Sequence, residues 1–201
     1  MKLLTLIFIL CLSANLFAKS TLKAHNHDGV LKTKLVVEED GKSLAIEMES
    51  SGDSLLGFET KPKSKFQKAV YQAVKNIWEN KLSSLIIFDK ASACRINETS
   101  FNMEFETHEE EHSHHHKKAH KHEENHSEIL AKANIACTKS VSGSEASIKM
   151  KSIFNKTIRS LYEQNKKKRH HFVGNVKLEV IPAKGKPFVK TSKSSSFKVN
   201  L

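Results

Sequence analysis

The sequence has few of the residues that build phosphate-binding loops, disulfide frameworks or multiple membrane spans. Only seven glycines, three prolines and three cysteines occur in 201 residues. It contains no glycine-rich phosphate loop, no HExxH motif and no GxSxG motif, so nothing in it favours an enzyme. With 38% hydrophobic and 27% charged residues, it has too little apolar material for a multispanning membrane protein. We expect a single globular domain that does not catalyse a reaction.

The N-terminus contains the one long apolar run, from Leu3 to Leu12. This run is shorter than the ~20 residues that span a bilayer as a helix, and small or polar residues follow it up to Ala18. The pattern is typical of a secretory signal peptide, so we expect residues 1–18 to be cleaved and residues 19–201 to form the mature domain. A lipoprotein with Cys11 acylated is the alternative, but the residues before this cysteine are not small.

Removal of residues 1–18 leaves two cysteines, Cys94 and Cys137. An even number of cysteines in an exported chain predicts a disulfide. The alternative is a pair of thiolate metal ligands, although neither cysteine has a second ligand two to four residues away.

Hydrophobic periodicity predicts an α+β fold, in which two helices pack on an antiparallel sheet. Alternation indicates strands at 30–37 and 44–48, joined at Asp40-Gly41, and a long hairpin that pairs 101–105 with 129–135. Further strands are expected at 85–88 and 172–180, and an edge strand at 197–201. Helical spacing predicts amphipathic helices over 66–82, with Ser64 and Gln67 as a capping box, and near 152–163. We expect the tail from Lys184 to Ser196 to be mobile.

A histidine-rich insert at 108–127 would lie at the tip of that long hairpin. It contains eight histidines, five glutamates and three lysines, with Ala119 as its only apolar side chain. Such a segment buries too little surface to offset its ordering entropy, so we expect a disordered loop. Neutral imidazole binds zinc, copper and nickel, and many imidazoles together favour several exchangeable ions over one rigid site. The candidate ligands here are His108, His112, His114, His115, His116, His120, His122 and His126.

Two smaller clusters accompany the insert. His25 and His27 stand beside Asp28 near the mature N-terminus, and in a turn their rings can converge on one ion. Lys166 to Arg169 form a basic run, followed by His170 and His171. A basic run on an exported protein can meet lipid phosphates or anionic polymers, although most such runs are solvated loops.

The order of short motifs resembles the ZrgA family of zinc-regulated periplasmic proteins of Gram-negative bacteria. The motifs run through nearly the whole mature chain: Ala24-His25-Asn26-His27-Asp28-Gly29, Asp40-Gly41, Leu56-Gly57-Phe58-Glu59, Ala93-Cys94, the histidine-rich insert, Ile135-Ala136-Cys137 and Phe154. Two motifs depart from the family pattern. In the first, Asn26 stands where the family has glutamate and Asp28 is an extra residue, and in the other, Thr60 stands where the family has histidine. The resemblance implies periplasmic residence, zinc binding through the insert and a contribution to zinc acquisition.

The resulting prediction is a periplasmic protein that captures or buffers zinc for a zinc uptake transporter or its solute-binding protein. A copper or nickel buffer is an alternative, because imidazole sites usually bind Cu(II) more tightly than zinc. A second alternative is a basic module that binds lipid or another surface and binds metal only incidentally.

Overall fold

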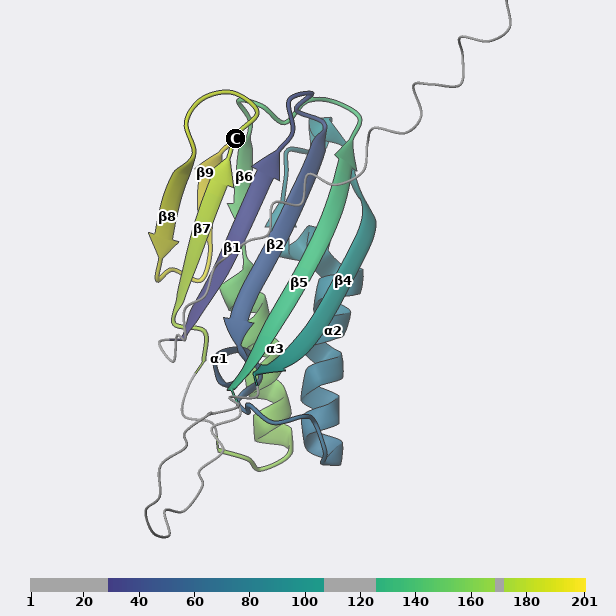
Figure 1. Ribbon diagram of the computed structural model, residues 1–201, viewed down its shortest axis with the longest axis vertical. Coiled ribbons are helices and arrows are strands. Elements are labelled where there is room, and N and C mark those ends of the chain that lie inside the picture. The colour runs from purple at the N-terminus through teal and green to yellow at the C-terminus, as the bar shows by residue number, and fades with distance from the viewer. Residues whose placement is uncertain (1–28, 107–125, 169–171) are drawn as a thin grey trace, which may run out of the picture.

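The computed structural model describes residues 29–106, 126–168 and 172–201, and these form an α+β fold as predicted (Figure 1). The strands are β1 (Val30–Val37), β2 (Ser43–Ser51), β3 (Ile86–Ile87), β4 (Cys94–Glu106), β5 (His126–Cys137), β6 (Glu145–Ile148), β7 (Asn175–Ile181), β8 (Phe188–Ser192) and β9 (Phe197–Asn200). The helices are α1 (Gly52–Leu56), α2 (Lys65–Leu85) and α3 (Met150–Gln164), with a 3-10 turn at Lys90–Ser92. The expected signal peptide and residues 108–125 of the insert fall outside the described residues. The expected disorder is wrong for His126 and Ser127, the last two residues of the insert, because they pair with β4 as the first residues of β5.

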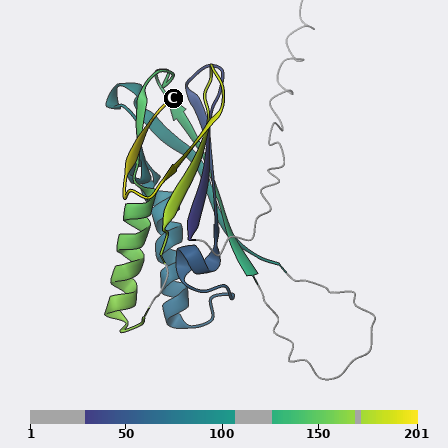
Figure 2. The same cartoon turned by 90° about the vertical axis from the view of Figure 1, so that its left-hand side faces the viewer.

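The elements form two layers. One layer is a six-stranded sheet in the order β4-β5-β2-β1-β7-β8, and the other combines a three-stranded sheet, β3-β6-β9, with α2 and α3. Seen edge-on, the two long helices cover one end of the large sheet and the small sheet covers the other end (Figure 2). Among the described elements, none covers the opposite face of the large sheet.

One pair of strands departs from the antiparallel pairing that we expected. β1 and β7 are parallel, with Val30 opposite Asn175, whereas all the other paired strands are antiparallel. The reason lies in α3, which returns the chain to the end of the sheet where β1 begins. β7 therefore enters the sheet beside β1 in the same direction.

The apolar stripe of α2 forms the core, as its spacing predicts. Val70, Val74, Trp78 and Leu82 are fully buried, and Trp78 Nε1 donates a hydrogen bond of 3.1 Å to the Lys132 carbonyl of β5. The predicted capping box is also present, because the Ser64 hydroxyl accepts from the Gln67 amide while the Gln67 side chain accepts from the Ser64 amide. The buried stripe holds α2 against the core from Val70 onward, and the capping box fixes where the helix begins.

The expectation of a mobile tail between Lys184 and Ser196 is wrong. β8 lies within this segment and pairs with β7 as an edge of the large sheet. Its side chains are mostly exposed, so backbone hydrogen bonds hold it in place. Because neither face of β8 is buried, its sequence has no alternation of hydrophobic residues that would predict a strand. The predicted C-terminal strand is confirmed, although β9 pairs with β6 in the small sheet.

The β1–β2 turn depends on Asp40 and Gly41. The Asp40 carboxylate accepts hydrogen bonds from the backbone amides of Ser43 and Lys42 at 2.9 and 2.7 Å, and these bonds lower the pKa of this exposed side chain. Gly41 adopts a positive φ of 65°, and its carbonyl accepts from the Val141 amide at 2.7 Å. The turn is thereby joined to the segment that follows β5.

We expect Gly41→Ala to destabilise the protein more than Gly143→Ala. Both glycines have left-handed φ values, 65° and 77°, where a side chain costs about 1 to 2 kcal/mol. A Cβ at Gly41 would also lie 2.1 Å from Ser140 Oγ, whereas a Cβ at Gly143 meets nothing within 4 Å. Urea unfolding of the two variants measures the difference, and equal losses would show that the close approach at Gly41 contributes nothing.

Candidate metal-binding end of the sheet

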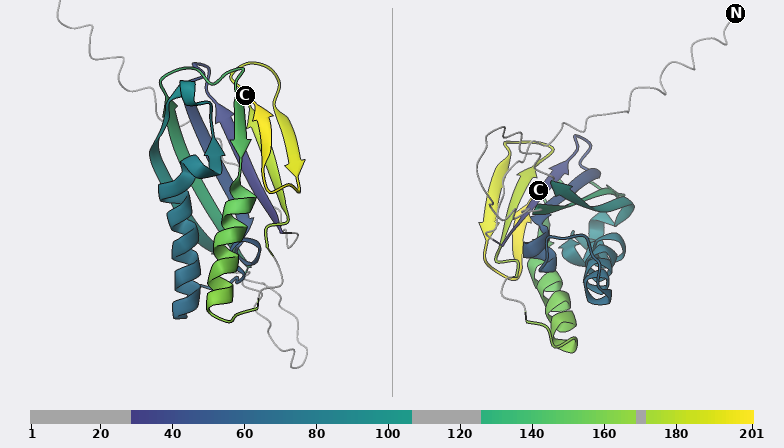
Figure 3. Two further views of the ribbon diagram at one scale, coloured as in Figure 1. Left: turned by 180° about the vertical axis from the view of Figure 1, so that it is seen from behind. Right: turned by 60° about the horizontal axis from the view of Figure 1, so that its bottom comes forward.

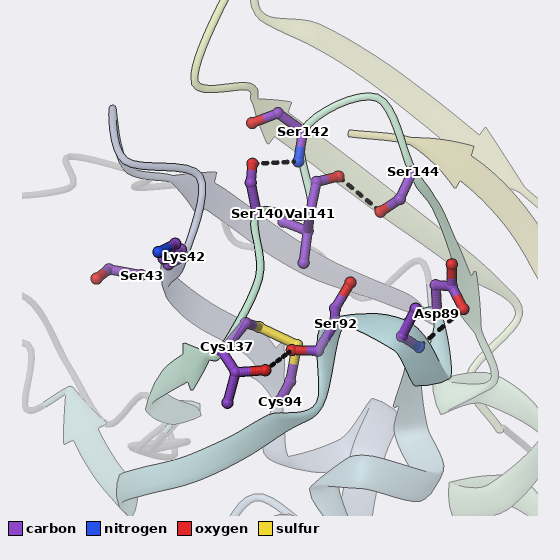
Figure 4. Close-up of a disulfide and its surroundings, with 12 residues drawn as sticks. Lys42, Ser43, Asp89, Ser92, Cys94, Cys137, Ser140, Val141, Ser142 and Ser144 are labelled. Atoms are coloured by element: carbon purple, nitrogen blue, oxygen red, sulfur yellow. Dashed lines mark hydrogen bonds between the residues drawn. A yellow bond between two sulfur atoms is a disulfide. The ribbon is translucent and has the colours of Figure 1, made fainter.

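The predicted disulfide is present and closes the long hairpin (Figure 4). Cys94 begins β4 and Cys137 ends β5, and the two residues are register partners with Cα atoms 3.9 Å apart. The thiolate-ligand alternative is therefore wrong, because both sulfur atoms are in the bond. Thr138 strengthens the junction by donating from its amide and its hydroxyl to the Ser92 carbonyl.

At the opposite end of the same hairpin, four chain segments meet. β4 ends at Glu106 and β5 begins at His126, and these two residues are partners in register. β1 and β7 begin at this end too, at Val30 and Asn175. The register of β2 with β5 places Ser51 opposite Glu128, which aligns the two halves of the sheet. The histidine-bearing segments at 25–27, 108–122 and 170–171 are therefore all joined to the described chain at this one end of the sheet, as Figure 1 also shows.

His126 is the histidine that the structure describes, and it contacts a carboxylate. Its Nδ1 lies 3.2 Å from Glu59 Oε2, and both side chains are about one-fifth to one-quarter exposed, at 21% and 24%. When the ring is neutral and Nδ1 carries the proton, this contact fixes the tautomer and leaves the Nε2 lone pair for a metal ion. The pair has the arrangement that protein zinc sites use to orient an imidazole ligand.

Glu59 reaches His126 because α1 packs tightly against the start of β5. A Cβ at Gly52 would lie 2.1 Å from Ser127 Oγ, so the close approach of the two segments requires glycine. The end of α1 is held from the other side by Tyr162 of α3, whose hydroxyl donates a hydrogen bond of 2.9 Å to the Leu56 carbonyl. Glu59 therefore projects from a turn that is fixed to both layers of the fold.

Further carboxylates lie near this end of the hairpin. Glu104 of β4 is the register partner of Glu128 of β5, and alternation puts Glu128 on the same face as His126. The open face of the hairpin thus presents acidic side chains and an oriented imidazole where the insert is attached.

These groups do not complete a metal site by themselves. Within residues 29–106, 126–168 and 172–201, no three or more histidine, cysteine, aspartate or glutamate side chains gather closely enough to hold an ion. The other predicted ligands all lie outside the described residues, namely His25, His27, His108, His112, His114, His115, His116, His120 and His122. His170 and His171 lie outside them as well.

Glu59 is the site residue that sequence reasoning missed. Its signal was the Gly57-Phe58-Glu59 motif, in which Glu59 matches the family pattern and the next residue, Thr60, replaces the histidine expected there. The partner of Glu59 is 67 residues away along the chain. Only the fold of α1 against β5 brings the two together.

The fold and this end define an α+β protein with a disulfide-closed hairpin that carries a histidine-rich insert. The model of the ZrgA family zinc uptake proteins matches residues 24–162. This match covers well over half of the 201 residues, and the chain belongs to this family. No curated protein matches the chain. The matched range ends within α3, so β7, β8 and β9 lie beyond it.

The match also bears on the identity of the metal. A zinc uptake family favours zinc over the copper and nickel alternatives. None of the helices in the described residues has both the length and the apolar character that a membrane crossing requires.

Proposed function

We propose that this protein is a periplasmic zinc-binding protein that captures zinc through its histidine-rich insert and passes it to an uptake system. The observation that carries the proposal is that β1, β5 and β7 begin, and β4 ends, at one end of the large sheet, where the histidine-bearing segments are attached. Zinc is the cargo in this proposal, and the recipient is a zinc uptake transporter or its solute-binding protein. We propose binding without catalysis, because an exchangeable cargo site needs neither an open coordination position nor a positioned base.

Chain connectivity supports the proposal. His108 is two residues beyond Glu106, and His27 is two residues before Gly29. Each residue extends the chain by at most about 3.6 Å, so these imidazoles are tethered within a short distance of the same end of the sheet. Twelve histidines occur in the sequence, and each stands at this end or in a segment attached to it. This arrangement raises the local concentration of ligands at one place.

The chemistry of the described residues supports a graded mode of binding. His126 is fixed by Glu59 and can serve as an anchored first ligand, while tethered imidazoles complete the coordination. Carboxylates at Glu104 and Glu128 add negative charge that favours a divalent cation. One ion would thus bind more tightly near His126, and others would exchange within the insert.

We expect Glu59→Gln to weaken the tightest zinc site by about tenfold or more without changing the total number of ions bound. Glutamine keeps the shape of the side chain but removes the charge that orients His126, and loss of such outer partners typically lowers metal affinity 10 to 100-fold, in order of magnitude. Competition titration against a chromophoric chelator measures the affinity. His126→Gln should produce at least the same loss.

Glu98→Gln provides the matched control for this measurement. Like Glu59, Glu98 contacts a side chain of β5, because Asn134 Nδ2 lies 3.4 Å from its carboxylate. Glu98 differs in its position, which is close to the disulfide end of β4. Zinc affinity should be unchanged in this variant. Equal affinities for Glu59→Gln and the unsubstituted protein would remove Glu59 from the proposed site, and an unchanged affinity in His126→Gln would remove His126.

A further inference from the structure

A group of exposed lysines covers the end of the helical layer. Lys61, Lys63, Lys65 and Lys68 lie at and just before the start of α2, and Lys166, Lys167 and Lys168 follow the end of α3. We call these seven residues the lysine end. All seven are exposed, and none forms an ion pair with a carboxylate of the described residues.

The packing of the two helices brings these lysines together. α2 and α3 run antiparallel, so the start of one lies beside the end of the other (Figure 3). The Phe66 and Tyr162 rings meet edge to face with centroids 4.8 Å apart, which fixes the two helix ends side by side. Segments that are about 100 residues apart in sequence therefore share one positively charged surface.

The position of the first four lysines is unfavourable for folding. The start of a helix carries a partial positive charge that favours acidic residues, yet α2 has no acidic residue in its first turn. The lysines after α3 lie at a helix C-terminus, where cations are favourable and need no special explanation. The lysines around the start of α2 are thus the ones that call for an external anion.

We propose that the lysine end docks the protein on a bilayer surface that contains anionic phospholipid. An anionic headgroup surface attracts lysine side chains even where the protein offers no apolar patch. An interface with a protein partner, in contrast, usually has an apolar centre. Among the described residues, the large exposed hydrophobic side chains are Ile87, Phe105, Phe188 and Val189, and all four lie in strands. The lysine end therefore fits a lipid surface better than an acidic protein.

Docking in this orientation would place the proposed zinc-binding end close to the membrane. The lysine end and the open end of the β4–β5 hairpin lie at the same end of the molecule (Figures 1 and 3). The disulfide lies at the far end of the hairpin. Zinc held near His126 would thus be presented toward the surface in which a transporter is embedded. This inference goes beyond the proposed function and can fail while zinc binding stands.

The test is sedimentation of the full mature chain with vesicles of phosphatidylethanolamine and phosphatidylglycerol, in the presence of a chelator that removes zinc. Each lysine near an anionic surface contributes roughly a fivefold gain in partitioning. We expect Lys61→Gln, Lys63→Gln, Lys65→Gln and Lys68→Gln together to lower partitioning by up to about several hundredfold, since they remove four such contributions. Added salt should release the unsubstituted protein, and phosphatidylcholine vesicles should not retain it.

A matched control removes four exposed lysines from the opposite end of the sheet. Lys42, Lys139, Lys184 and Lys186 lie in the turns at that end, and their replacement by glutamine changes the net charge equally. This variant should keep most of the vesicle binding. An equal loss in both variants would show attraction by net charge alone, and overturn the proposal. Binding to polyglutamate without binding to vesicles would also overturn it, in favour of an acidic protein partner.

Discussion

Replacing the seven histidines between His108 and His122 with glutamine is expected to remove more than half of the zinc that the protein binds. These residues are seven of the twelve histidines in the chain, and they lie in the segment between β4 and β5. Glutamine retains polarity and approximate size but offers no imidazole nitrogen to zinc. Elemental analysis after equilibration with buffered zinc gives the number of ions lost, and calorimetric titration gives the affinity of those that remain.

The fold of this variant should be unchanged. The strands on either side are held by backbone pairing along the whole hairpin, and the disulfide joins their far ends. The unfolding midpoint without metal should therefore match that of the unsubstituted protein. Substitution is preferable to deletion of 108–127, because β5 already includes His126 and the buried Ser127. Unchanged zinc content in a folded variant would reject the role of the insert.

His170→Gln and His171→Gln together form the comparison for this experiment. They remove imidazoles from a shorter segment that enters the sheet through β7, beyond the range that the family model matches. We expect a small loss of zinc, since two ligands next to a basic run are weak competitors for a cation. A loss as large as that of the insert variant would mean that zinc binding depends on histidine number and not on the insert.

The elements of the fold that the sequence predicts correctly are those whose signals are local in the sequence. The alternation at Leu31 and Leu35, the turn at Asp40-Gly41 and the helical stripe from Val70 to Leu82 each identify a surface that must be buried. The hairpin that pairs Phe101 with Ala131 was also predicted, because both of its strands alternate and a polar insert separates them. In each case the side chains that set the pattern are the ones that form the core.

The features that were missed depend on contacts between distant segments. The parallel pairing of β1 with β7 follows from the path of α3, and no residue in either strand records the direction of its neighbour. β8 is exposed along most of its length, so its backbone pairing with β7 leaves no hydrophobic signal. The contact between Glu59 and His126 requires α1, a helix of five residues that is too short to detect by periodicity.

The arrangement separates a rigid scaffold from the segments proposed to bind zinc. The disulfide, the 3-10 turn and the small sheet stabilise one end of the large sheet, and the histidine-bearing segments are attached at the other end. Ligands that must exchange ions gain from a tether that does not take part in the core. Variation in the insert then has little effect on folding, while the scaffold keeps the insert at a defined place.

Replacing both Cys94 and Cys137 with alanine is expected to lower the free energy of unfolding by up to about 4 kcal/mol. The bond closes a loop with a sequence separation of 43, and the chain-entropy estimate for a loop of this length is about 4 kcal/mol. Small domains are stable by only about 5 to 15 kcal/mol, so this is a large fraction of the total. Both positions lie at the edge of the core, with Cys137 7% exposed, so alanine leaves little cavity to add to the loss.

Urea unfolding of the double variant and of the oxidised protein measures this loss, and reductant provides its internal control. Reductant should destabilise the unsubstituted protein and leave the double variant unchanged, because only the former has a bond to break. Zinc binding by the folded double variant should be retained, since β4–β5 pairing continues from the bond to Glu106 and His126. A loss of zinc without a loss of stability would contradict the separation of scaffold and metal-binding end, because it would connect the cysteines to the ligands directly.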